Sequence, residues 1–211
     1  MVNRYPSVAR KCSPERRLIA WCVIASTKAA HASFTKATQS ISRVITQIHI
    51  FQARLTRVPL IGTLVRRVAN CYGKKMSGAH PLTIEEANEV VDTSDGLAVD
   101  PCTCRAVSGK CDKPVGTEIM VGLNRNMFME ERPHDYHEIT KQEAKEILKQ
   151  CHEVGLIHTI VKCRRDFYAI CNCCSCCCLP LRLSKEYGIG GALTRRLGVV
   201  EELKRERRSG A

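Results

Sequence analysis

Acidic side chains are nearly absent from the first 80 residues of this 211-residue chain. Glu15 is the single acid there, against fourteen Lys and Arg, which leaves a net charge of +13. Residues 81–211 carry nineteen Lys and Arg against twenty Asp and Glu, so the overall charge of +12 arises in the N-terminal third. This shift in composition predicts a boundary at residue 80. The expected parts are residues 1–80, residues 81–190 and a charged C-terminal tail at residues 191–211.

Long hydrophobic runs and a secretory signal are also missing. The apolar stretch at residues 18–30 covers thirteen positions, whereas a helix needs roughly 20 to cross hydrocarbon. More basic sequence follows it instead of a small-residue cleavage site, so we expect a cytoplasmic chain with reduced thiols. The acid-poor composition of residues 1–57, rich in Arg, Lys, Ser and Thr, also suits an organelle transit peptide.

Apolar residues recur at helical spacing across residues 14–69, with basic residues between them. The positions that share a face are Leu18, Trp21, Cys22 and Ala25 in one group and Ile41, Val44, Ile45, Ile48 and Leu55 in another. The pattern predicts two or three basic amphipathic helices. Such helices are expected to form a solvated cap, to lie peripherally on an anionic membrane surface, or to pack against an acidic partner.

Beyond residue 80 the pattern predicts an α+β domain. Thr83 with Glu86, and Thr140 with Glu143, have the spacing of capping boxes, which begin helices. Strands are predicted at residues 97–100, 156–162 and 166–170, the last two as a hairpin leading into Cys171. Residues 201–208 read as a charged helix or tail. The predicted fold class is thus α+β: a basic helical N-terminal segment, then a small cysteine-rich α+β domain.

Cysteine, in contrast, is abundant: nine of the fourteen cysteines fall in two windows, residues 102–111 and 171–178, and neither window contains histidine. Cysteines crowded into one short run rarely meet disulfide geometry, so metal binding by thiolates is the better interpretation. The candidate ligands are Cys102, Cys104, Cys111, Cys171, Cys173, Cys174 and Cys177, although spacing alone leaves open which of the six thiols in the second window bind.

All-thiolate sites suit iron–sulfur clusters, zinc or copper(I). The spacing here is Cys-x-Cys and Cys-x-Cys-Cys, whereas zinc sites usually contain Cys-x-x-Cys pairs. The sequence therefore favours one or two iron–sulfur clusters of the [4Fe-4S] type, with zinc as the alternative. Basic residues should lie beside the ligands and partly neutralise an anionic cluster: Arg105, Lys110, Lys113, Arg164 and Arg165.

At these residues the chain resembles bacterial and archaeal ferredoxin-like iron–sulfur proteins. The shared motifs are Cys102-Thr-Cys104-Arg105, then Cys111-Asp-Lys-Pro114, Gly155-Leu-Ile-His158, and Cys171-Asn-Cys173-Cys174. The likeness covers roughly residues 59–190. It implies a four-iron cluster held by Cys102, Cys104, Cys111 and cysteines of the 171–178 run, in a protein that carries electrons.

Three functions follow as hypotheses. The first is an iron–sulfur electron-transfer or redox accessory protein that docks to a redox partner or larger complex. The second is a redox- or metal-responsive nucleic-acid-binding protein that uses the basic region, although few aromatic residues are available there for stacking on bases. The third is an enzyme whose cluster leaves one iron open to substrate; no catalytic triad, P-loop or hydrolase His-Glu motif is present.

The remaining cysteines and histidines are expected to be structural. Buried thiols are predicted for Cys12, Cys22, Cys71 and Cys151, whereas Cys163 lies nearer the predicted site. The histidines considered are His134, His137 and His158.

Overall fold

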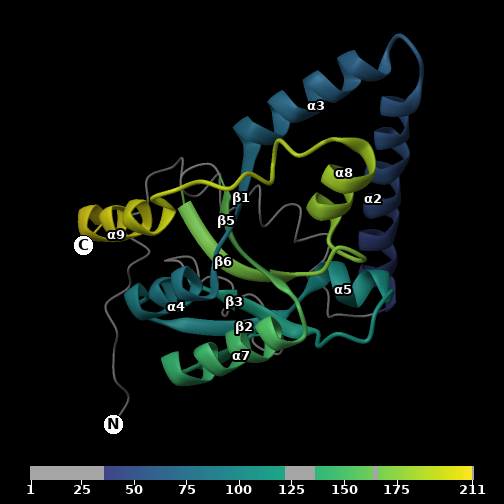
Figure 1. Ribbon diagram of the computed structural model, residues 1–211. Helices are drawn as coiled ribbons and strands as arrows, with labels where there is room; N and C mark the ends of the chain where they lie inside the picture. Colours follow the sequence, from purple (N-terminus) through teal and green to yellow (C-terminus); the bar gives the residue numbers. More distant parts are fainter. Residues whose placement is uncertain (1–35, 122–135, 164–165, 211) are drawn as a thin grey trace.

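The structure is a computed structural model that describes residues 36–121, 136–163 and 166–210. Two helices come first, followed by strands and helices that build one sheet and its cover (Figure 1). The elements are α2 (Lys36–Arg54), η2 (Leu55–Arg57), α3 (Gly62–Met76), β1 (Ser77–Pro81), α4 (Ile84–Thr93), β2 (Leu97–Pro101), α5 (Thr103–Ser108), β3 (Gly116–Met120), β4 (His137–Ile139), α7 (Lys141–Glu153), β5 (Ile157–Cys163), β6 (Asp166–Cys173), α8 (Leu179–Tyr187) and α9 (Val199–Gly210).

Six strands in the described ranges form one antiparallel sheet in the order β1-β5-β6-β3-β2-β4. The predicted α+β class is therefore confirmed, and so is the β5–β6 hairpin. Strand β6 is longer than predicted: it continues through Cys173, so Cys171 and Cys173 lie on a strand instead of in the loop after it. The boundary expected at residue 80 falls inside β1, which pairs with β5 along its whole length.

Helices α4, α7 and α9 cover one face of the sheet and enclose the main core (Figure 1). The residues expected as a charged helix or tail form α9, and Val199, Val200 and Leu203 of this helix are buried in the core. The C-terminal part is therefore integrated into the domain and does not extend from it as a tail. Burying three aliphatic side chains in this way contributes on the order of several kcal/mol to stability.

Both predicted capping boxes are present. The Thr83 hydroxyl accepts from the backbone N–H of Glu86, whose carboxylate accepts from the backbone N–H of Thr83, and the same reciprocal pair begins α7. Helix α7 ends at Glu153, and Gly155 then adopts the left-handed conformation with a φ of 70°. Because these signals are local, they were readable in the sequence.

Helices α2 and α3 form a helical arm, residues 36–76, at the end of the molecule away from α9 (Figure 1). The helix predicted over residues 41–55 is confirmed up to Arg54, whereas the first predicted face, at residues 18–25, lies outside the described residues. Helix α2 packs against α5 and α8. Over the described part of the chain, no helix combines the length and apolar character needed to cross a membrane.

Candidate metal centre

Nine cysteines meet at one corner of the sheet, where β2 and β6 end. Cys102 is the N-cap of α5 and Cys104 lies in its first turn, directly after β2. Cys171 and Cys173 occupy the end of β6, and Cys178 is the N-cap of α8. The sheet brings the two windows together because β3 pairs with both β2 and β6.

Four of these thiols form a compact cluster, hereafter the four-thiol cluster: Cys111, Cys174, Cys176 and Cys177. Their four sulfur atoms all lie within 4.8 Å of one another. The Cys111 Sγ atom is 3.8 Å from that of Cys174 and 3.7 Å from that of Cys177. It is the one group of metal-ligand type with this spacing in the described ranges, and it is able to hold a metal ion.

The other five thiols of the corner lie in a neighbouring group, hereafter the five-thiol group: Cys102, Cys104, Cys171, Cys173 and Cys178. The Cys178 thiol is near enough to those of Cys104 and Cys173 for them to shift its pKa, and the same holds for Cys173 and Cys171. Cys102 is close enough to interact electrostatically with Cys104. Among described residues, no three of these sulfurs meet the spacing that defines the four-thiol cluster.

The predicted ligands are therefore all in this corner, but they are distributed between two groups. Of the predicted set, Cys111, Cys174 and Cys177 belong to the four-thiol cluster, whereas Cys102 and Cys104 do not. The sequence analysis had placed all three cysteines of the first window on one metal. It also omitted Cys176 and Cys178, since spacing alone does not reveal which way each thiol of the run points.

The four-thiol cluster has one thiol that ionises readily. Burial opposes ionisation of Cys174, but hydrogen bonding to Arg105 and to neighbouring thiols lowers its pKa to about 6. Burial and contact with the thiols of Cys111 and Cys174 raise the pKa of Cys176 to about 12. Cys174 thus loses its proton near neutral pH whereas Cys176 keeps its own, so binding of a cation by Cys176 would release a proton.

Arg105 lies beneath both groups and is 1% exposed. Its Nη1 donates to the backbone carbonyl of Asn172 at 2.9 Å and its Nη2 to the Thr117 hydroxyl at 2.5 Å, but its buried Nε has no partner among the described residues. Burial opposes its charge, yet the thiols of Cys102 and Cys174 hold the Arg105 pKa above its ordinary value. The donor set and this buried cation fit an anionic thiolate-bound metal centre.

The other basic residues predicted beside the ligands differ in position. The Lys113 Nζ donates to the carbonyl of Gly155 at 3.3 Å, and the backbone of Lys110 is hydrogen-bonded to Cys177. Residues 164 and 165 lie outside the described residues.

Asn172 links the strands that carry the site. It is fully buried between Cys171 and Cys173; its Nδ2 donates to the Thr117 carbonyl at 2.6 Å, and its Oδ1 accepts from the Nδ1 of His158 at 2.6 Å. Burial lowers the pKa of His158. The sequence analysis missed Asn172 as a site residue, although a lone amide between two strand cysteines was a usable signal, since such a side chain needs buried partners.

The isolated cysteines gave mixed results. Cys151 is buried beside the four-thiol cluster as predicted, and burial raises its pKa to about 11. The prediction for Cys71 was wrong, because its thiol is exposed on α3. Cys12 and Cys22 lie outside the described residues, and the side chain of Cys163 is not among those described.

Comparisons of this chain with models of protein families, with curated proteins and with solved structures gave no match. A functional assignment therefore has to be argued from the cysteine corner and the surfaces of the chain.

Proposed function

We propose that this protein binds iron–sulfur at the cysteine corner and acts as an electron carrier or redox accessory protein, without catalysis of its own. The observation that carries the proposal is the buried Arg105 beneath nine thiols from two distant parts of the chain. An iron–sulfur cluster supplies reversible one-electron transfer when it is bound.

The charge balance of the corner supports this proposal. Removing a guanidinium from water is costly unless it is paired. The groups that hold the Arg105 pKa above its ordinary value are the thiols of Cys102, Cys174 and Cys111. Thiolates bound to iron–sulfur would remain ionised and would supply the missing negative charge, while the arginine would raise the potential of the centre.

The motifs that resemble ferredoxin-like iron–sulfur proteins give independent support. They include Arg105, which follows Cys104 directly, and Asn172, which lies between Cys171 and Cys173. In this proposal the protein acts in the cytoplasm and passes electrons to a redox partner protein or complex.

A second candidate is a single structural zinc ion in the four-thiol cluster. Four thiolates about 2.3 Å from one tetrahedral ion lie roughly 3.8 Å apart, and the measured separations from Cys111 are 3.7 and 3.8 Å. A four-iron cluster spaces its thiolates more widely, because each binds a different iron, so these four thiols would have to move apart to hold one. A zinc ion here would tie the turn after α5 to the loop before α8 and would have no redox activity.

The deciding experiment is anaerobic purification followed by iron, zinc and sulfide analysis, with paramagnetic resonance of the reduced protein. We expect iron and acid-labile sulfide in equal amounts, broad visible absorbance that bleaches on reduction, and a signal that disappears on oxidation. A colourless protein with one zinc per chain would refute the iron–sulfur proposal and establish the structural alternative.

A further inference from the structure

Neighbouring cysteines of the second window belong to different groups. Cys173 is in the five-thiol group and Cys174 in the four-thiol cluster; after the turn, Cys177 belongs to the cluster and Cys178 to the group. Since side chains alternate across a strand, the end of β6 sends successive thiols in opposite directions. One short run of chain therefore contributes to two separate sets of sulfurs.

The five-thiol group lies at the N-terminus of a helix. Cys178 is the N-cap residue of the nine-residue helix α8, and its side chain makes no capping hydrogen bond there. Cys104 lies close to Leu179 in the first turn of the same helix. Helix N-termini present free N–H groups and a partial positive charge, which favour anionic sulfur. This positive charge is independent of Arg105.

Most of the group is buried. Cys102, Cys173 and Cys178 are each no more than 8% exposed. The Oε1 atom of Glu118 lies 3.6 Å from the Sγ of Cys171. Since no three of the sulfurs, all from described residues, gather as tightly as in the four-thiol cluster, the arrangement suits a polynuclear cluster better than a single ion.

We propose that the five-thiol group is a second metal site, which binds an iron–sulfur cluster of its own next to the four-thiol cluster. This inference rests on the proposed iron–sulfur function. Four of the five thiols would bind, so that the run 171–178 would supply Cys171, Cys173 and Cys178 to this site and its other three cysteines to the four-thiol cluster.

The test compares two double variants of the full chain, C104S/C178S and C174S/C176S, with C151S as the matched control for a buried thiol that is no ligand. We expect each double variant to keep the iron and sulfide of one centre, and C151S to keep all of the wild-type content. Full iron content in C104S/C178S would overturn the second site, and so would complete loss of iron from both double variants if they remain folded. Absence of iron from the wild type would instead overturn the proposed function itself.

A measurement on the wild type covers the case in which the double variants do not fold. Integration of the resonance signal in the fully reduced protein should give two interacting spins per chain. One spin per chain would overturn the proposal.

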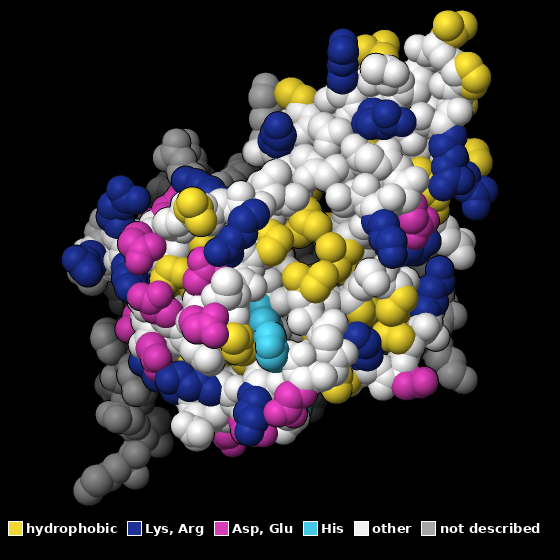
Figure 2. Space-filling view, viewed as in Figure 1, with side chains coloured by type: hydrophobic (Ala, Val, Ile, Leu, Met, Phe, Trp, Pro, Cys, Tyr) yellow, Lys and Arg dark blue, Asp and Glu magenta, His cyan; other side chains and the backbone are white. Residues whose placement is uncertain are grey.

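A separate observation concerns the helical arm, which exposes most of the apolar surface outside the core. Of the fifteen large hydrophobic side chains that are exposed among the described residues, eleven lie between Val44 and Tyr72. Leu60, in the turn between the two helices, is 100% exposed, and Leu64 is 63% exposed. In Figure 2 hydrophobic side chains gather at the tip of the arm, beside Lys and Arg. Apolar patches of this kind usually mark a binding surface.

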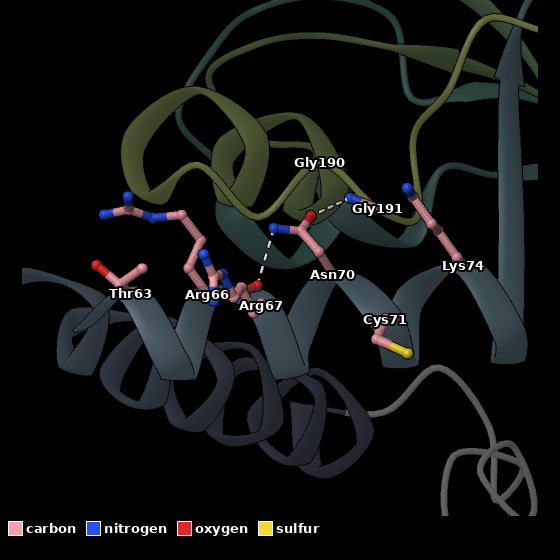
Figure 3. Close-up of a pocket in the computed structure, with 8 residues that line it drawn as sticks. All are labelled: Thr63, Arg66, Arg67, Asn70, Cys71, Lys74, Gly190 and Gly191. Carbon is pink, nitrogen blue, oxygen red and sulfur yellow. Dashed lines mark hydrogen bonds between the residues drawn. The ribbon is translucent and has the colours of Figure 1, made fainter. Parts of the chain in front are cut away.

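The charge of the arm indicates what covers this surface. Residues 36–76 contain eight Lys and Arg and no acid. Arg66, Arg67 and Lys74 of α3 line an open pocket of about 660 Å³ against Gly190 and Gly191 (Figure 3). An exposed apolar surface flanked by basic side chains matches an anionic lipid surface, which attracts Lys and Arg.

We infer that the helical arm docks on anionic phospholipid bilayers, with the tip around Leu60 inserted among the headgroups. The full chain should sediment with vesicles that contain phosphatidylglycerol and not with pure phosphatidylcholine vesicles. L60D/L64D should reduce the bound fraction at least tenfold, whereas L197D, at a leucine that is 83% exposed outside the arm, should not change it. Failure of the full chain to bind anionic vesicles, equal binding by L60D/L64D, or a stable dimer that buries the tip would overturn the inference.

Discussion

Replacing Arg105 by methionine tests the electrostatic reasoning most directly. The substitution keeps most of the side-chain volume but removes the charge and two hydrogen bonds, to the Asn172 carbonyl and the Thr117 hydroxyl. Hydrogen bonds from charged groups contribute about 1.5–3 kcal/mol each, so R105M should lower the free energy of unfolding by about 3–5 kcal/mol. That is a large part of the free energy of unfolding of an ordinary domain. Denaturant unfolding under anaerobic conditions measures this change in the free energy of unfolding.

The same change should lower the reduction potential of the metal centre. A unit charge about 5 Å from the centre contributes roughly 3 kcal/mol at an effective dielectric constant of 20, which corresponds to a shift on the order of 100 mV for one electron. R105K should keep most of the potential while losing stability, because an ammonium cannot span both acceptors. R182M, at an arginine of α8 that is paired with Glu186, is the matched control. An unchanged potential in R105M, measured by voltammetry, would refute the electrostatic role.

Three further predictions concern other parts of the chain. Burial holds the pKa of His158 below 6.5, so on acidification the unfolded chain takes up a proton before the folded chain does. The free energy of unfolding should therefore fall as the pH drops below about 6.5 toward the pKa of the folded state. H158Q should flatten this dependence on pH, and an unchanged slope in unfolding experiments would contradict the assignment. Lys162 binds the Glu202 carboxylate at 2.7 Å. K162M should therefore lower the free energy of unfolding by about 1–3 kcal/mol and increase hydrogen exchange in α9. Unchanged protection of the α9 amides in K162M would count against the contact. In the folded, metal-loaded protein Cys71 should react with iodoacetamide and Cys151 should not, as mass spectrometry can determine; rapid labelling of Cys151 would show that its burial is wrong.

Local signals in the sequence were sufficient for much of the fold. Both capping boxes depend on residues three positions apart, and the β5–β6 hairpin depends on contiguous strand-forming runs, so neither requires knowledge of distant contacts. The corner itself was also predictable, because an all-thiolate composition without histidine limits the chemistry. Metal binding by thiolates could be predicted because it depends on which residue types are present.

The arrangement of the ligands was not readable from spacing. The two groups form because β3 pairs with β6 through Ile119 and Ile170, a register that no local pattern specifies. This pairing sets the end of β6 beside the end of β2 and so decides which thiols approach Cys104. The exposure of the arm was equally hidden, because an apolar stripe on a helix has the same spacing whether it faces a core or solvent.

The sequence separation within the four-thiol cluster has a consequence for biosynthesis. Cys111 meets Cys174, which lies 63 residues later in the chain. At a synthesis rate of about 5–20 residues per second, Cys111 leaves the ribosome roughly 3 to 13 seconds before its partner exists. During that interval the thiols of the first window lack the partner cysteines that complete the metal site, and they are exposed to oxidation. Metal can therefore be inserted only after most of the domain has been made, and a cell would need to keep the early thiols reduced until then.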